Sequence, residues 1–276
     1  MKLLMRDEAK GREHTIFVTI FSALMVMLAI VVMLMASATA VSGVTLQLDK
    51  NAVDILDKQV ENRAGYIQDQ LQQAQDLTEL SSFINDTARQ MLDEGTISLD
   101  TLDSTGGESL PLLEAAAPRL LKALRAKQVS GVFLILNTHD FTDRTSGDRL
   151  PCVYLRDLDP EAASSADNSD VMFERAPAEL VQAFGITTDK AWTPAQQYLD
   201  GEEDAFYVRP FQAAYESGEQ TGAAADYGRW TTLPYTLLGD DREAIAYAQP
   251  LILDDGTVYG VLGIEMLESY MDTKLP

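Results

Sequence analysis

The chain has 276 residues and a formal net charge of −22, because 43 Asp and Glu residues outnumber 21 Lys and Arg residues. The length is enough for one or two domains with a sizeable core, and a hydrophobic content of 46% is too high for a disordered chain. The acidity excludes nucleic acid as the expected partner, because a phosphate backbone needs a basic protein face. The single cysteine, Cys152, has no partner for an intramolecular disulfide, and two histidines are too few for a His-rich metal site.

The N-terminal part predicts a transmembrane helix over residues 15–40. The run 16–36 is almost wholly apolar, and no charged residue lies between Thr15 and Leu48. At about 1.5 Å per residue this run spans roughly 30 Å, the hydrocarbon thickness of a bilayer. A cleaved signal peptide is the alternative. Its apolar region is usually shorter, about 7–15 residues, although the small residues at 36–40 would permit cleavage.

The basic residues around this run set the expected orientation. The first basic residue after the run is Lys50, whereas four precede it: Lys2, Arg6, Lys10 and Arg12. The positive-inside rule places residues 1–14 in the cytoplasm and residues after about 45 outside. The expected localisation is therefore the cell membrane, with nearly all of the negative charge on the extracytoplasmic side.

Residues 41–94 are predicted to form one long extracytoplasmic helix. Apolar residues recur at steps of three or four from Val53 to Met91, the pattern of one helix face, and no proline interrupts them. Gly95 is the expected stop. Such a stripe needs a surface to cover it. That surface is either the chain's own domain or the same helix of a second copy, so a homodimer is a candidate assembly.

Residues 95–276 predict an α+β module with an antiparallel sheet, because hairpin-linked strands follow helices gathered earlier in the chain. Asp-Asp-Gly at 254–256 predicts a tight hairpin, since Asp-Gly supplies the positive φ of a type I′ turn. The loop-rich region 158–242 is where a ligand is expected. Helices are predicted at 110–127, 177–184, 206–215 and 267–274, and strands at 131–136, 152–156, 243–253 and 257–266.

The order of these segments resembles the extracytoplasmic double Cache sensor domain of bacterial receptors. The closing stretch 246–266, AYAQPLILDDGTVYGVLGIEM, is similar to the family's signature pair of strands. Gly260 and Gly263 would let the long helix approach this strand closely. The resemblance implies a PAS-like sheet against which the long helix packs, with a ligand-sensing Cache module over 95–276. The chain ends where the family's membrane-distal module would end, so any output domain is expected downstream.

The resemblance also implies site residues. Many members clasp a free amino acid with an Arg-Pro-Trp-Tyr segment, and the similar segment here keeps Arg209 but has Phe211 in place of Trp. The family's downstream Asp is missing after Tyr235, and Asp240 follows closely. The alternatives are a surface pair of Arg209 with Glu202 or Asp204, and ordinary core packing of the aromatic residues. The predicted ligand-binding residues are Arg209, Phe211, Tyr207, Trp230, Tyr235, Tyr154 and Asp240.

The leading function is the extracytoplasmic sensing region of a bacterial transmembrane receptor, with an amino acid or another small polar metabolite as ligand. The alternative is a membrane-tethered binding or dimerisation module without signalling output. An enzyme is not expected, because Gly-x-Ser-x-Gly, His-Glu-x-x-His and phosphate-loop motifs are all missing. No cofactor or metal is expected either, since the acidic stretch 157–170 lacks the Asp-x-Asp-x-Asp-Gly spacing of a calcium loop.

Overall fold

A computed structural model describes residues 4–160, 169–199, 205–218 and 223–274, with the backbone alone for 4–21, 36 and 38–49. The chain divides into two compact units, residues 1–66 and 67–276. The helices are α1 (Leu4–Ala74), α2 (Thr78–Asp93), α3 (Leu110–Lys127), α4 (Ala178–Phe184), α5 (Val208–Ser217) and α6 (Glu268–Lys274), with short 3₁₀ turns η1 (Phe141–Asp143) and η2 (Ala224–Tyr227). The strands are β1 (Gly131–Leu136), β2 (Arg149–Leu150), β3 (Cys152–Asp157), β4 (Val171–Arg175), β5 (Thr187–Thr193), β6 (Gln196–Gln197), β7 (Arg229–Trp230), β8 (Ala244–Ile252) and β9 (Val258–Leu267).

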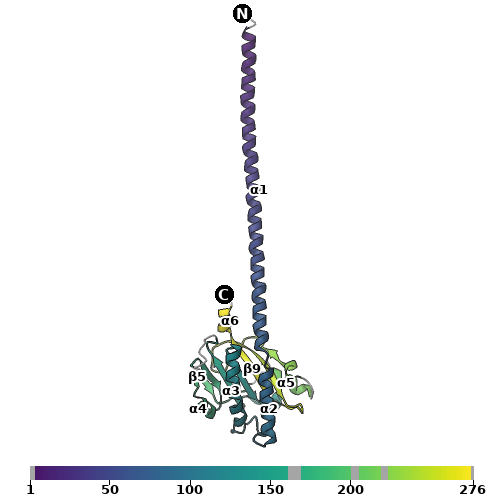
Figure 1. Ribbon diagram of the computed structural model, residues 1–276, viewed down its shortest axis with the longest axis vertical. Helices are drawn as coiled ribbons and strands as arrows, with labels where there is room; N and C mark the ends of the chain where they lie inside the picture. The colour runs from purple at the N-terminus through teal and green to yellow at the C-terminus, as the bar shows by residue number, and fades with distance from the viewer. Residues whose placement is uncertain (1–3, 161–168, 200–204, 219–222, 275–276) are drawn as a thin grey trace. The chain divides into compact units, whose positions relative to one another are not determined.

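Seven strands of the described part form one sheet in the order β5-β4-β3-β1-β9-β8-β7 (Figure 1). Neighbouring strands are antiparallel except β4 and β5, which are parallel. The predicted α+β class with a mainly antiparallel sheet is therefore confirmed. The central strand β1 begins and ends where the sequence predicts, because its six consecutive apolar or small residues suit a strand buried on both faces.

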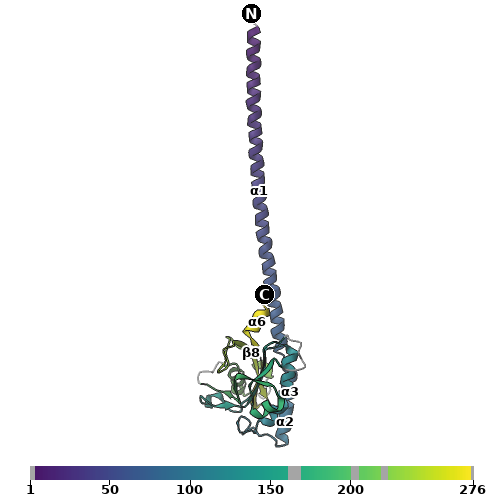
Figure 2. The same cartoon turned by 90° about the vertical axis from the view of Figure 1, so that its left-hand side faces the viewer.

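Helices α2 and α3 lie side by side against one face of this sheet (Figures 1 and 2). Leucine and alanine residues recur at helical spacing on α3, and they are buried against alternate residues of the strands. Leu120 of α3 and Leu134 of β1 belong to this apolar layer, and neither has exposed surface. We call this the α2–α3 face. It holds the larger hydrophobic core of the sheet unit.

The opposite face of the sheet carries a second apolar layer, which is rich in aromatic side chains. Helix α5 packs there against β8 and β9. The layer includes Phe133 of β1, Tyr154 of β3 and Phe206, which precedes α5. Phe206 stacks on Tyr235 with ring centroids 4.3 Å apart and meets Phe133 edge-on at 4.9 Å. We call this the α5 face.

The long helix predicted over 41–94 is interrupted at residues 75–77, which corrects that prediction. The Asp76 side chain accepts a hydrogen bond from Thr78 N at 3.2 Å, so it satisfies the first N–H group of α2. Lys127 of α3 donates to the carbonyl oxygens of Gln73 at 3.0 Å and Asp76 at 2.6 Å, and so satisfies carbonyls at the end of α1. At the other end, α2 stops as predicted before Gly95, whose φ is +70°.

Helix α1 covers the residues for which a membrane span is predicted. Among the residues that the structure describes, no helix has both the length and the apolar character needed to cross a bilayer. The predicted span 15–40 includes residues 15–21, 36 and 38–40, whose side chains lie outside the described part.

Two glycine predictions need correction. A Cβ on Gly263 would collide with the ring of Phe133 in the neighbouring strand, and one on Gly260 would lie 2.6 Å from Ile135 O. Both glycines therefore make room for β1 and not for a helix. In the β8–β9 hairpin only Gly256 has a positive φ, +87°. The turn is thus a three-residue loop closed by a left-handed glycine, and not type I′.

Candidate functional site

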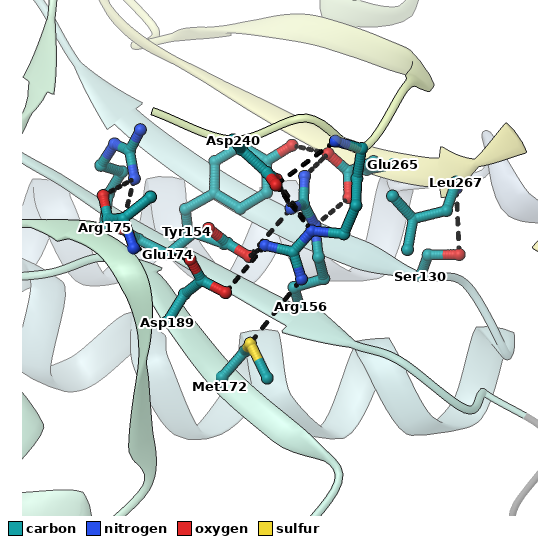
Figure 3. Close-up of polar contacts among 12 residues, drawn as sticks. Ser130, Tyr154, Arg156, Met172, Glu174, Arg175, Asp189, Asp240, Glu265 and Leu267 are labelled. Atoms are coloured by element: carbon teal, nitrogen blue, oxygen red, sulfur yellow. Dashed lines mark hydrogen bonds and ion pairs between the residues drawn. The ribbon is translucent and has the colours of Figure 1, made fainter. Parts of the chain in front are cut away.

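Arg156 is the centre of a buried group of charged and tyrosine side chains on the α5 face (Figure 3). Alternation along β3 puts it on the same face as Tyr154. Gly131 of β1 pairs with Arg156 on one side and with Glu265 of β9 on the other. A Cβ at Gly131 would lie 2.9 Å from Glu265 Cβ and 2.9 Å from its Oε1. The glycine therefore leaves the space through which Glu265 reaches Arg156 across β1.

Glu265 and Arg156 form a bidentate ion pair. Arg156 Nε lies 2.7 Å from Glu265 Oε1, and Nη2 lies 2.8 Å from Oε2. The hydroxyl groups of Tyr154 and Tyr235 also donate to Oε2, the latter at 3.2 Å, and they lie 2.8 Å from each other. Both oxygens of this carboxylate therefore have donors, as a buried carboxylate requires.

Three further acidic side chains and a second arginine complete what we call the Arg156 cluster: Glu174 (β4), Asp189 (β5), Asp240 and Arg242. Arg156 Nη1 donates to Glu174 Oε1 at 2.9 Å and to Asp240. Arg242 donates to Glu174 Oε1 at 3.0 Å, to Asp189 at 2.8 Å and to Asp240 at 2.8 and 2.9 Å. The cluster ties the loop after Tyr235 to three strands.

Burial is the strongest influence on ionisation in the cluster. It raises the pKa of Tyr154 and of Tyr235 well above the ordinary range, so both hydroxyl groups keep the protons that they donate. Burial also opposes the ionisation of Asp240. Hydrogen bonds from Arg242 and Arg156 outweigh it there, and the pKa of Asp240 falls to about 2.

Glu174 differs from Asp240 in the direction of its pKa shift. Burial raises its pKa more than Arg156 and Arg242 lower it, and the negative charges of Asp189 and Glu265 add to the rise. Its side chain has no exposed surface, and its Oε2 has no hydrogen-bond partner in the structure. The geometry can therefore hold a proton on this oxygen. A nucleophile beside a general base is not found in the Arg156 cluster.

Three of the predicted ligand-binding residues come together in the Arg156 cluster: Tyr154, Tyr235 and Asp240. Tyr207 and Phe211 lie in the adjoining aromatic layer and are almost wholly buried. Each meets Phe141 edge-on, with ring centroids 5.8 and 5.1 Å apart. These ring contacts match the alternative of ordinary core packing, and a ligand-binding role for the two residues stays a prediction.

The structure does not bring Arg209 and Trp230 to this cluster. Arg209 is exposed on α5. Its proposed surface partners, Glu202 and Asp204, lie outside the described residues. Trp230 belongs to the α2–α3 face, where it contacts Tyr247 and donates to Gln75 Oε1 at 3.0 Å. The aromatic residues among the predicted ligand-binding residues are therefore divided between the two faces of the sheet.

The predicted binding residues leave out Arg156, Glu174, Glu265, Asp189 and Arg242, although the sequence places Arg156 at a strand end where its side chain can face a cleft. A signal exists for Arg156 and Glu265, because each is a charged residue inside an otherwise mostly apolar strand. Such residues are seldom fully buried unless they are paired. The strand Val171–Arg175 was itself part of the region predicted as loops, so Glu174 had no strand to mark it.

Three surface pockets in the described part are lined by other residues. A cavity of about 830 Å³ lies between α2 and α3 beside Phe83 and Arg119, and one of about 640 Å³ lies at the α1–α2 break beside Asp76 and Tyr247. A third, of about 320 Å³, lies at the start of α3. None of the seven predicted ligand-binding residues lines these three. In the described part no group of His, Cys, Asp and Glu has the arrangement of a metal site.

Comparison with known proteins gives a distant likeness. No family model and no curated sequence matches the chain. One similar solved structure is the periplasmic sensory domain of the Campylobacter jejuni chemoreceptor Tlp1, with a TM-score of 0.40 and 14% identity over 77% of this chain and 59% of that one. Another is methyl-accepting chemotaxis protein X, with a TM-score of 0.35 and 15% identity over 79% of this chain and 64% of that one. The chain spans less than two thirds of either structure, and at these scores the likeness assigns no function.

Proposed function

We propose that this chain is the extracytoplasmic sensing region of a bacterial transmembrane signal-transduction receptor. The proposal rests on one observation. A single helix, α1, leads from an apolar stretch into a sheet unit that has a buried charged cluster on one face. Large apolar side chains described in that stretch are mainly exposed, among them Leu24 at 62%, Met27 at 70% and Met33 at 76%. An apolar helix of this kind needs lipid or other helices around it.

The stimulus would act on the α5 face, at or beside the Arg156 cluster. A small polar ligand could bind there only by exchanging some of the cluster's internal bonds for bonds of its own. Such an exchange would favour one arrangement of the loop after Tyr235 over another. A ligand shifts a receptor only by its difference in affinity for two states, typically about 1–3 kcal/mol.

A thermal-shift screen of the full chain in detergent tests this proposal, with amino acids, small carboxylates, amines, purines and sugars as probes. A specific ligand at about 100 times its Kd adds about 2.7 kcal/mol to the free energy of unfolding. Two variants then locate the site: Tyr235→Phe in the cluster and Arg209→Gln on α5. If either variant loses the ligand-induced rise in melting temperature, the result supports binding on this face. If both variants keep this rise, the ligand binds elsewhere. Glu179→Gln, at an exposed position on α4, is the matched control.

The second candidate is a tethered dimerisation module, which the exposed apolar residues of α1 favour. Val53, Leu56 and Val60 are 54%, 58% and 65% exposed and recur at helical spacing. Disulfide cross-linking of Val60→Cys in membranes, with Lys58→Cys as the control, reports whether this stripe pairs with a second copy. A cross-linked chain for which no probe shifts the melting temperature would favour the dimerisation module.

A further inference from the structure

Glu174 is packed against charged groups from every element around it. Arg156 faces it from β3, Glu265 from β9 and Asp189 from β5, while Asp240 and Arg242 face it from the loop before β8 (Figure 3). Its neighbour Arg175 turns to carbonyl oxygens and donates to those of Glu174, Ala191 and Leu238 at 2.7, 3.0 and 2.8 Å.

The charges of the Arg156 cluster, counted together with its neighbour Arg175, do not balance when every carboxyl group is ionised. The arginines are Arg156, Arg175 and Arg242, whereas the carboxyl groups are Glu174, Asp189, Asp240 and Glu265. One negative charge is left over, and an uncompensated charge in a buried site is strongly disfavoured. One proton restores the balance.

The hydrogen bonds indicate where that proton belongs. Both oxygens of Glu265 and of Asp240 accept hydrogen bonds from arginine or tyrosine, and the Asp189 oxygens accept from Arg242 and from Ala191 N. Oε1 of Glu174 accepts from both Arg156 and Arg242. Only Oε2 of Glu174 is left without a donor among these carboxylate oxygens.

We propose that Glu174 is a proton-binding residue of this module, and that the charge of the Arg156 cluster follows the pH of the extracytoplasmic medium. This inference rests on the proposed function for its biological meaning but not for its chemistry. The stimulus it identifies is the proton, taken up at Oε2 from water and released to it. No other bond forms or breaks.

The cluster has a short path to the C-terminal end of the sheet. Asp240 follows Tyr235, whose backbone pairs with Ala244 at the start of β8 through bonds of 2.9 and 3.0 Å. Ala244 in turn pairs with Leu267 at the end of β9, and helix α6 begins at the next residue. A change of charge at Glu174 therefore acts on a loop joined to the strand pair from which α6 leaves.

The direction of the pH effect follows from the raised pKa. The folded chain keeps a proton on Glu174 at pH values where the unfolded chain, with an ordinary pKa of 4.5, has released it. The contribution to stability is full below that ordinary pKa. It is lost as the pH rises through the raised pKa of the folded state. The full chain should therefore become less stable with rising pH over this window.

The test measures denaturation midpoints of the full chain in detergent between about pH 5 and about pH 8. The denaturation midpoint of the wild type should fall as the pH rises. Glu174→Gln keeps an acceptor for both arginines and cannot ionise, so its midpoint should fall clearly less over the same pH range. Glu179→Gln should follow the wild type. His139 contacts Asp103 at 2.6 Å, so His139→Gln is the second control.

A direct readout keeps the inference testable if Glu174→Gln fails to fold. The infrared carboxylic-acid band of the wild type, followed from acid to alkaline pH, should contain a buried component that disappears at a higher pH than the band of the exposed carboxyl groups. The inference is overturned if this component is missing, or if Glu174→Gln and the wild type share one pH profile, or if His139→Gln alone abolishes the dependence. If Glu174 titrates as expected but the chain transmits no signal, the proposed function is contradicted. The assignment of Glu174 as a proton-binding residue would still hold.

Discussion

The two faces of the sheet stabilise the same strands by different means. Along β3, Val153 and Leu155 point to the α2–α3 face and meet leucines, whereas Tyr154 and Arg156 point to the α5 face and meet carboxylates. Apolar contacts of the first kind are insensitive to pH. A buried ion cluster depends on every partner being present, because one missing charge leaves the others uncompensated. The comparison teaches that both faces stabilise the sheet, but only the charged face does so through contacts that depend on ionisation.

The largest predicted effect tests the charged face. Arg156→Ala leaves Glu265, Glu174 and Asp240 without their shared partner, so the free energy of unfolding should fall by about 3–5 kcal/mol near neutral pH. The loss should shrink in acid, because protonated carboxyl groups no longer repel one another. Urea denaturation at two pH values measures both. An equal loss at both would show that Arg156 acts through its bulk alone.

A variant on the α2–α3 face gives the measurement to compare with Arg156→Ala. Leu120→Ala removes a fully buried side chain of α3 and should cost about 2–5 kcal/mol, through lost burial and the cavity that remains. This loss should be the same at both pH values, since no charged group of the cluster is touched. A pH-dependent loss would mean that the two faces are not energetically separate.

The smallest effect concerns the contact between the sheet and the end of α1. Trp230→Phe keeps an aromatic ring against Tyr247 but removes the hydrogen bond to Gln75, so about 1 kcal/mol should be lost. Gln75→Ala should cost a similar amount, and the double variant little more than either. Thermal denaturation of the three variants forms the double-mutant cycle. Additive losses would mean that the bond contributes nothing.

Elements with strong local patterns were predictable. The strand at 131–136 and the helix at 110–127 have the predicted bounds, because apolar runs and helical spacing depend only on nearby residues. Strand β5 was missed because Thr187–Thr193 is a polar edge strand with no alternating pattern. The α1–α2 break was missed because Leu77 keeps the apolar spacing through it, while the bond from Thr78 N to the Asp76 side chain favours a turn at this point.

The site was predictable only in part. Tyr154, Tyr235 and Asp240 were chosen from the sequence and do meet. The partners that make them a cluster lie up to 111 residues away along the chain, as for Tyr154 and Glu265. No local pattern carries the register that brings β3, β4 and β9 together. The missing side chain at Gly131 is as necessary for the cluster as the charges, because it gives Glu265 the space to reach Arg156. The sequence around residue 131 does not show this requirement.

The space above Gly131 also constrains how this sequence can change over time. Residues 131 and 265 occupy one volume, since a methyl group on the first would press on the carboxylate arm of the second. An alanine at 131 should therefore be found in relatives only where residue 265 is shorter. Such a relative would also need a new counter-ion for Arg156, or a neutral residue in its place. Linked substitution at 131, 156 and 265 is thus a signature by which relatives that keep this buried charge could be told from those that have lost it.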